Sequence, residues 1–313
     1  MKRFLKEVVI NNRINQFSKN FRENYQLYIM LLPGLILLFV FKYIPLYGIT
    51  LAFKEYNPML GILGSPWVGL KYFQQFFESP DFWQLMQNTI ILSAMALVAG
   101  FIAPIILALL INQVRSVGLK KNIQLIVYAP NFISVVIVVG MLFIFLSPVG
   151  PVNSLITSKG FKEIPFMTSA EYFRDVYVWS GVWQVTGWGS IIYLAALSNV
   201  NEELIEAAKL DGASLLQRIR YIELPTIKPI AVILLILSAG SLMSIGFEKV
   251  YLMQTSLNMA TSEILPTYIY KQGLLMNNYS YSTAIGLFNS AINLVLLIGV
   301  NMVVKKLNEG EGL

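Results

Sequence analysis

The segment Glu206–Pro225 reads EAAKLDGASLLQRIRYIELP and lies between two of the most apolar segments of the chain. Just before it, Asn201 is placed to cap a helix whose first turn contains Glu202 and Glu203. Carboxylates there favour a helix, because the amino end of a helix carries partial positive charge. A charged helix between two apolar segments predicts an element that lies on the aqueous side of a membrane protein.

The same segment contains a turn that should divide it into two short helices. Asp211-Gly212 is a turn sequence, and a second helix is expected from Ala213 to about Glu223. Pro225 has no amide hydrogen, so it should prevent a simple continuation of that helix. Two short helices at an angle, with small residues at the bend, predict a knob that can fit a groove on another protein. A cytoplasmic hairpin without any partner is the alternative interpretation.

The composition and the spacing of apolar residues predict a membrane protein. Charged residues make up 13% of the 313 residues and hydrophobic residues make up 56%, whereas a soluble domain carries about a quarter charged residues. A bilayer core of about 30 Å needs about 20 mostly apolar residues per helix. We predict an all-α fold, a polytopic transmembrane helix bundle of about six spans. The predicted spans are residues 25–47, 88–110, 123–146, 176–197, 229–246 and 283–304.

Lysine and arginine fall mostly on one side of these predicted spans. Residues 1–24, the basic turn near Arg115, the segment 199–228 and the tail at Lys305-Lys306 share that side. The positive-inside rule therefore predicts cytoplasmic N and C termini. Residues 1–24 lack the apolar core and cleavage site of a signal peptide, so we interpret them as a cytoplasmic lead-in. Residues 1–313 are expected to form one transmembrane domain.

The residue types that are missing exclude several kinds of chemistry. The chain has no cysteine and no histidine, which removes thiol nucleophiles, imidazole bases and nearly every zinc site. No catalytic, cofactor-binding or metal-binding residue is predicted. The phosphate loop G-x-x-x-x-G-K-[ST] is absent from the sequence, so ATP hydrolysis would need another polypeptide. The net charge of +6 reflects topological bias, so nucleic acid is not an expected partner.

Three short motifs within the opening segment carry a family resemblance. Glu206-Ala207-Ala208 is followed by Asp211-Gly212-Ala213 and then by Leu224-Pro225. At this spacing they resemble the signature loop of the membrane permease subunits of binding-protein-dependent ABC importers. The stretches WVGLKYF, APIILALLINQVR and GVWQVTGWGSIIYLAAL resemble the carbohydrate-uptake branch, most of all its polysaccharide and complex-oligosaccharide type. Ile219 departs from the pattern, because an aromatic residue is more usual there.

The resemblance implies a type I ABC importer permease fold in the plasma membrane of a prokaryote, with several passes through the lipid. The segment 199–228 would be a coupling loop that docks into a cytoplasmic ATPase. Its docking residues would be Glu206, Ala207, Ala208, Asp211, Gly212, Ala213, Leu224 and Pro225. The expected partners are a second homologous permease, two ATPase subunits that bind ATP and Mg²⁺, and an extracytoplasmic solute-binding protein. The expected substrate is an oligosaccharide or a polysaccharide fragment.

Polar and aromatic residues of the spans are candidates for the sugar pathway. A neutral polyol is held by hydrogen-bonding side chains and aromatic faces. The span 176–197 offers Trp183, Gln184 and Trp188 among several glycines. The family resemblance places substrate contacts in this span and the next. Packing between helices is the alternative role for each of the three.

The last two spans add further candidates. Ser238, Ser241 and Ser244 are spaced to share one stripe of a helix, although small residues on one face also mark close helix packing. Glu248 lies at the outer end of the same span, where an ion pair is its alternative role. Asn289 and Asn293 are one helical turn apart in the last span, and an interhelical hydrogen bond is their alternative role.

Two other functions remain open at the level of the sequence. The docking motif concerns energy coupling, so an ABC importer permease for a non-carbohydrate solute has the same signature. A polytopic membrane enzyme would need a nucleophile, a base or a metal cluster facing one cavity. The predicted spans contain no paired carboxylates, which favours a transporter subunit over an enzyme.

Overall fold

The computed structural model describes residues 23–307, so most of the predicted lead-in 1–24 lies outside the described residues. Helices make up most of the described chain, and one isolated antiparallel bridge joins Lys54 to Trp67. The α-helices are α2 (Tyr25–Leu38), α3 (Gly61–Gly64), α4 (Lys71–Phe77), α5 (Phe82–Asn112), α6 (Val117–Tyr128), α7 (Val135–Phe145), α8 (Pro151–Ser158), α9 (Ala170–Leu197), α10 (Glu202–Leu210), α11 (Leu215–Arg218), α12 (Leu224–Ala239), α13 (Phe247–Met253), α14 (Met259–Ser262), α15 (Leu265–Tyr270) and α16 (Tyr279–Leu307).

Short π-helical and 3-10 segments continue or join these helices. The π-helical segments are η1 (Phe39–Tyr43), η4 (Ile219–Glu223) and η6 (Lys271–Leu275). The 3-10 segments are η2 (Ile44–Phe53), η3 (Ala129–Phe132) and η5 (Leu242–Ser244). Several of them lie within or beside long apolar helices, where they change the direction or the register of the chain.

Four helices of the described chain are long and apolar enough to cross a membrane: Tyr25–Phe53, Phe82–Asn112, Leu215–Ala239 and Tyr279–Lys306. A bent pair of helices brings the total to five if it counts as one span. The prediction of an all-α bundle with several spans is therefore confirmed. The predicted span 176–197 lies in α9, which is long enough but is not one of these apolar helices. The span contains Gln184 and several glycine, serine, tryptophan and tyrosine residues, which lower its mean hydropathy.

The predicted span 123–146 is wrong as a single straight helix. It bends by 96° between Val117–Phe132 and Val135–Phe145. Pro130 ends the first helix in the 3-10 segment η3. Ser134 then begins α7 as its N-cap, with its side chain accepting the Ile137 amide at 3.4 Å.

The predicted span 229–246 is also displaced. Helical structure runs without a gap from Leu215 to Ala239, directly through Pro225. The expectation that Pro225 stops the helix is therefore wrong. Pro225 lies in the first turn of α12, where its missing amide hydrogen costs little, and the π-helical segment η4 precedes it. The chain leaves the helix at Ala239 instead, so Ser241 and Ser244 do not share one helical stripe with Ser238.

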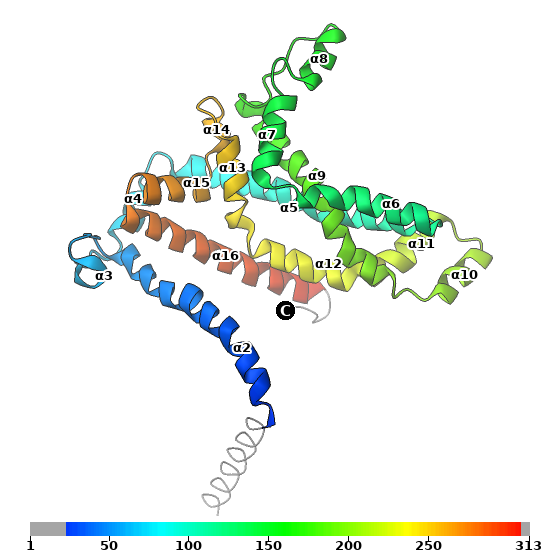
Figure 1. Cartoon of the computed structure of the whole chain (residues 1–313), viewed down its shortest axis with the longest axis horizontal. Coiled ribbons are helices and arrows are strands. Elements are labelled where there is room, and N and C mark those ends of the chain that lie inside the picture. Colours follow the sequence, from blue (N-terminus) through cyan, green and yellow to red (C-terminus); the bar gives the residue numbers. More distant parts are fainter. Residues whose placement is uncertain (1–22, 308–313) are drawn as a thin grey trace, which may run out of the picture.

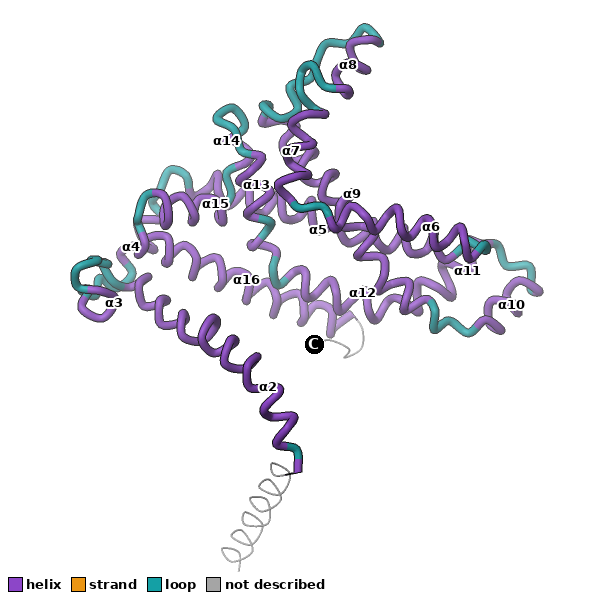
Figure 2. The backbone as a smooth tube through the Cα atoms, in the orientation of Figure 1, coloured by secondary structure: helices purple, strands orange, loops and turns teal. Residues whose placement is uncertain are grey.

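The two ends of the bundle carry different helices (Figure 1). α10 and α11 project at one end, and α3 and α4 lie at the opposite end. Between them α5 packs extensively along α9, and α12 lies beside α9 and α16. Figure 2 shows loop segments where α6 gives way to α7 and where α12 gives way to α13. α2 diverges from the bundle and buries no residue against the rest of the described chain, whereas η2 packs against α16.

Candidate coupling segment and translocation cavity

The opening segment forms the predicted short helix α10, a turn, and a second helical segment, α11 and η4, that continues into α12. Asn201 caps α10 by accepting the Glu203 amide at 2.9 Å. Gly212 has φ 78°, a left-handed conformation that glycine adopts without steric cost. Ser214 then starts α11 with a capping box, in which its backbone amide donates to Gln217 Oε1 at 2.7 Å. The predicted cap, turn and second helix are therefore confirmed as local structure.

The two helices form an exposed knob, here defined as residues 201–223. Leu210 and Leu216 are 90% and 75% exposed, which leaves apolar surface uncovered at the tip. A cavity of about 280 Å³ lies between the helices and includes four of the predicted docking residues, Ala208, Asp211, Gly212 and Ala213, in its lining. Glu206 and Ala207 are exposed on α10 beside it. Exposed apolar side chains around a depression are typical of a protein docking surface.

Leu224 and Pro225 occupy a different place from the other predicted docking residues. They begin α12 and are both exposed, at the base of the knob where it joins the bundle. The adjacent Glu223 is only 4% exposed, and both of its carboxylate oxygens accept from Gln113 Nε2, at 2.8 and 3.0 Å. Gln113 is the C-cap residue of α5. This contact ties the base of the knob to the end of α5.

The Gln113–Glu223 pair is not predicted from the sequence. The sequence signal for a buried carboxylate was a lone glutamate directly before Leu224-Pro225, at the start of an apolar helix. Its partner lies 110 positions away in the chain, so the pairing itself could not be read from local sequence. A buried carboxylate without a hydrogen-bond donor would be costly, which explains the close contact.

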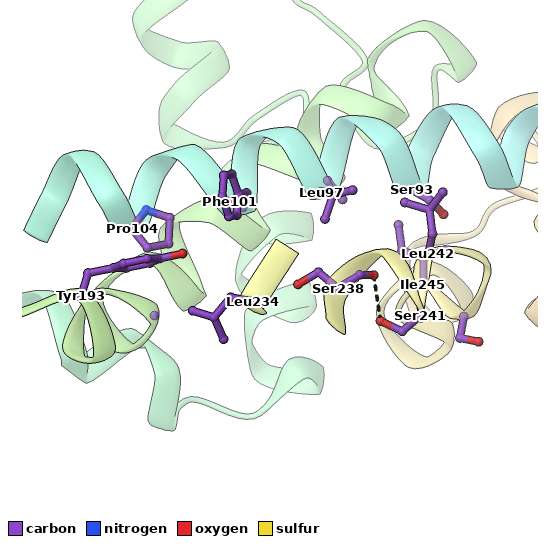
Figure 3. Close-up of a pocket in the computed structure, with 15 residues that line it drawn as sticks. Ser93, Leu97, Phe101, Pro104, Tyr193, Leu234, Ser238, Ser241, Leu242 and Ile245 are labelled. Atoms are coloured by element: carbon purple, nitrogen blue, oxygen red, sulfur yellow. Dashed lines mark hydrogen bonds between the residues drawn. The ribbon is translucent and has the colours of Figure 1, made fainter. Parts of the chain in front are cut away.

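A cavity of about 450 Å³ lies between α5, α9, α12 and η5 (Figure 3). Ser238, Ser241 and Ser244 all line it, although they come from the end of α12 and from the irregular chain that follows. The Ser241 hydroxyl donates to the Ser238 carbonyl at 3.1 Å. Ser93 lies at the same end, and Tyr193 and Pro104 lie at the other. The break after Ala239 thus gathers hydroxyl groups at one end of an otherwise apolar cavity.

The three candidates of the span 176–197 do not line this cavity. Gln184 is 7% exposed and its Nε2 donates to the Ile133 carbonyl at 2.9 Å, which holds the bend between α6 and α7. Trp183 lines a separate, wholly apolar depression of about 410 Å³ with Val138 and other residues. Trp188 packs edge-on against Phe132, with ring centroids 5.6 Å apart. Their observed contacts are those of helix packing.

The two asparagines of α16 have different surroundings. Asn293 Oδ1 accepts the Met243 amide at 2.9 Å, and its Nδ2 donates to Ser244 Oγ at 2.9 Å. Asn293 therefore fixes the irregular chain that lines the cavity. Asn289 is 8% exposed, and its Oδ1 has no hydrogen-bond partner within the described chain.

Glu248 and Lys249 are adjacent in the sequence but differ in burial, which the sequence did not reveal. Glu248 is exposed in the first turn of α13 and forms no ion pair with another described residue. Lys249 is only 7% exposed, and its Nζ donates to the Tyr177 carbonyl at 2.9 Å and lies 4.9 Å from the centre of the Tyr177 ring. The buried charge in this region is thus the lysine. Among residues 23–307, no group of three acidic side chains is placed to hold a metal ion.

Comparisons with known proteins agree with this architecture. Residues 100–309 match the family described as "Binding-protein-dependent transport system inner membrane component". Protein LplB of Bacillus subtilis (strain 168) is 45% identical over 288 residues, which cover 92% of this chain and 90% of that protein. The polygalacturonan/rhamnogalacturonan transport system permease protein YteP of the same strain is 46% identical over 288 residues, which cover 92% of this chain and 89% of that protein.

A solved structure extends the similarity to three dimensions. The crystal structure of a bacterial alginate ABC transporter, in complex with an alginate pentasaccharide-bound periplasmic protein, contains a chain of 38% identity. The match covers 94% of this chain and 99% of that chain, with a TM-score of 0.86. The family match spans most of this chain, and the relatives are transporter permeases that lie in the membrane. The chain accordingly belongs to the binding-protein-dependent transport system inner membrane components, as a multi-pass membrane permease subunit of an ABC importer.

Proposed function

We propose that this permease subunit moves oligosaccharides or polysaccharide fragments into the cytoplasm, driven by ATP hydrolysis on a separate subunit. The observation that carries the proposal is the identity of 46% over nine-tenths of the chain to a permease named for polygalacturonan and rhamnogalacturonan transport. The structural similarity to a transporter of the polysaccharide alginate supports the same substrate class. An importer for a non-carbohydrate solute is the second candidate, because an ATPase-docking knob does not determine which solute is transported.

The knob is the proposed docking element for the ATPase. Glu206, Ala207, Ala208, Asp211, Gly212 and Ala213 would contact the ATPase, and Leu224 and Pro225 would join this contact to α12. Exposed Leu210 and Leu216 supply apolar surface for the contact. ATP and Mg²⁺ would bind to the ATPase. The Gln113–Glu223 contact would pass movement of the knob to α5.

The rest of the assembly follows from the family. Residues 1–313 would act as one transmembrane domain, with a lead-in at 1–24 and a coupling loop at 199–228. It would pair with a second homologous permease, two ATPase subunits and an extracytoplasmic solute-binding protein, within membrane lipid. The solved relative in complex with its periplasmic protein supports the last partner.

The proposed substrate route passes through the cavity between α5, α9, α12 and η5. Ser238, Ser241 and Ser244 would bind sugar hydroxyls. Asn289, whose Oδ1 has no hydrogen-bond partner within the described chain, would be a further acceptor. Asn293, Gln184 and Trp188 would shape the route through the contacts that they make. Trp183 and Glu248 are both substantially exposed. They would contribute to the substrate route only where the partner permease completes its wall.

The cytoplasmic placement of both termini and of the knob is a separate proposal, which rests on the distribution of lysine and arginine. Because the natural chain has no cysteine, single cysteines at Lys209 and Lys159 can be labelled selectively. An impermeant thiol reagent applied to intact cells should label position 159 and leave position 209 unlabelled. Labelling of 209 without 159 would reverse the proposed topology.

Reconstitution with its partner subunits tests the transport function. The assembled importer should take up labelled oligosaccharides from a panel of neutral and acidic glycans, with ATP hydrolysed in parallel. Glu206→Lys and Gly212→Trp should abolish ATPase co-purification and uptake, because they change the docking surface. Glu171→Lys, the same charge reversal in the first turn of α9, is the control and should retain both. Uptake of another solute class with no glycan uptake would favour the second candidate function.

A further inference from the structure

A second, strongly polar cavity lies at the end of the bundle opposite the knob. Its volume is about 750 Å³, and it is built by α4, the turn before α5, η6 and the start of α16. α4 and η6 both pack against α16, so the wall is formed by segments far apart in the sequence. Five tyrosines line it: Tyr56, Tyr72, Tyr268, Tyr279 and Tyr281. None of its lining residues is shared with the serine-lined cavity.

The amide side chains of this cavity indicate that it faces water. Gln74 and Gln75 are both exposed on α4, and Asn277 and Asn278 are exposed between η6 and α16. Leaving such groups in hydrocarbon is costly, because no water replaces their hydrogen bonds. The side-chain amides of Gln74 and Gln75 form no hydrogen bond with any other described residue. Their donors and acceptors are thus available to a ligand.

The aromatic wall is held in place without a ligand. The Tyr279 hydroxyl donates to Asn277 Oδ1 at 2.9 Å, and Asn277 is the one non-glycine residue with positive φ, 59°, in the described range 23–307. Tyr56 packs edge-on against Tyr279, with ring centroids 5.7 Å apart. The Tyr56 amide is fixed in turn by Ser280 Oγ at 3.0 Å. A rigid wall reduces the entropy that is lost when a ligand binds.

The charges of this cavity disfavour an anionic ligand. Lys71 lines it, but its Nζ lies 3.1 Å from Glu55 Oε2. The hydrogen bond and the charge of Glu55 raise the pKa of Lys71, so the lysine remains protonated and paired. Glu78 also lines the cavity and has no ion-pair partner among residues 23–307. The uncompensated charge is therefore negative.

We propose that this cavity binds a neutral glycosyl unit of an oligosaccharide, as a subsite separate from the serine-lined cavity. The inference rests on the proposed function and names a further site and its preferred ligand. A pyranose ring presents C–H groups that pack on a tyrosine face, and its hydroxyls match the free amides of Gln74 and Gln75. A uronate unit would meet the charge of Glu78 without a free cation to balance it.

Saturation-transfer difference NMR on the purified full-length chain in lipid nanodiscs tests this proposal. The probes are cellotriose, a neutral trisaccharide, and trigalacturonate, an anionic one. The double variant Gln74→Ala/Gln75→Ala should weaken cellotriose binding about tenfold, as expected for the loss of hydrogen bonds from two amides. Tyr72→Phe removes a single hydroxyl from the wall and should weaken binding less. Gln87→Ala is the matched control, since Gln87 is exposed on α5 outside the cavity.

Each outcome decides the proposal. Saturation transfer to cellotriose that is lost in the double variant and kept in Gln87→Ala supports it. No transfer to cellotriose in the parent chain, equal transfer in parent and double variant, or tighter binding of trigalacturonate would overturn it. Because binding is measured on the chain alone, failure of glycan uptake by the importer would be a distinguishable result.

Discussion

The knob, the bend between α6 and α7, and the break after α12 all interrupt long helices. The contacts that hold the knob differ from those that hold the bend and the break. In the knob, Asn201 accepts the Glu203 amide and the Ser214 amide donates to Gln217, so these capping hydrogen bonds span two or three positions, whereas Glu223 at the base of the knob accepts from Gln113, 110 positions away. In the bundle, the bend before α7 is held by Gln184 from 51 positions away, and the break after α12 is held by Asn293 from 50 positions away. These capping contacts fix the start of each knob helix within a few residues of chain. Remote contacts make the bends dependent on the packing of the whole bundle.

The largest effect is expected where two helices touch most closely. A Cβ atom on Gly187 of α9 would lie 1.8 Å from the Val127 carbonyl oxygen of α6. Gly187→Ala should therefore push α6 away from α9 and destabilise the protein by about 3 kcal/mol, the upper end of ordinary overpacking. Thermal unfolding in detergent would measure this loss. Gly140→Ala in α7, where a Cβ meets nothing within 4 Å, is the control, and an equal loss in both variants would contradict the packing argument.

The next effect concerns the contact between the knob and the bundle. Gln113→Ala removes the donor to a carboxylate that is 4% exposed, and the cost of an unpaired buried polar group is about 1–3 kcal/mol. We expect a lower unfolding temperature. We also expect a rate of ATP hydrolysis that no longer increases when substrate is added. Glu223→Gln retains a polar pair and should be milder. Asn122→Ala, at an exposed position of α6, serves as the control. A Gln113→Ala importer with parental stability and coupling would exclude a role for the contact.

A smaller effect is expected at the break that lines the serine cavity. Asn293→Ala leaves the Met243 amide without its acceptor at 2.9 Å and frees Ser244. The cost should be about 1 kcal/mol, because neighbouring polar groups and water can replace part of the bond. Uptake should fall more than stability, since the cavity wall loses its fixed shape. The initial uptake rate and the unfolding temperature of the variant are each measured and compared with those of the parent. An unchanged uptake rate would contradict the predicted role of Asn293.

The smallest effect on the whole protein is expected from the knob. Asn201→Ala removes the cap of α10 and should cost that helix about 1 kcal/mol. The unfolding temperature of the bundle should not change, because the cap contacts only its own helix. Hydrogen exchange should accelerate within Glu202–Leu210 alone. Faster exchange throughout α9 and α12 would mean that the knob is not locally stabilised.

The difference between local and remote contacts also explains which structural features could be predicted from the sequence. The two helices of the knob and their turn were predicted from Asn201, Gly212 and the charges between them, because each signal acts within one turn of chain. Ser238, Ser241 and Ser244 were predicted as a group on one helix, and they do meet at one cavity, but around a break at Ala239. Gln184 was predicted in a sugar route, which stays a prediction, and its Nε2 holds the α6–α7 bend through the Ile133 carbonyl.

The sequence by itself determined the class of the protein and the local structure of the knob. Composition and apolar run length are summed along the chain, and capping and turn signals act over a few residues, so both can be read without a fold. The tertiary structure alone decided where the spans bend, that Glu223 pairs with Gln113, and which polar groups share a cavity. Those outcomes depend on backbone polar groups finding partners on other helices within a bilayer, and the positions that supply them lie far apart in the chain.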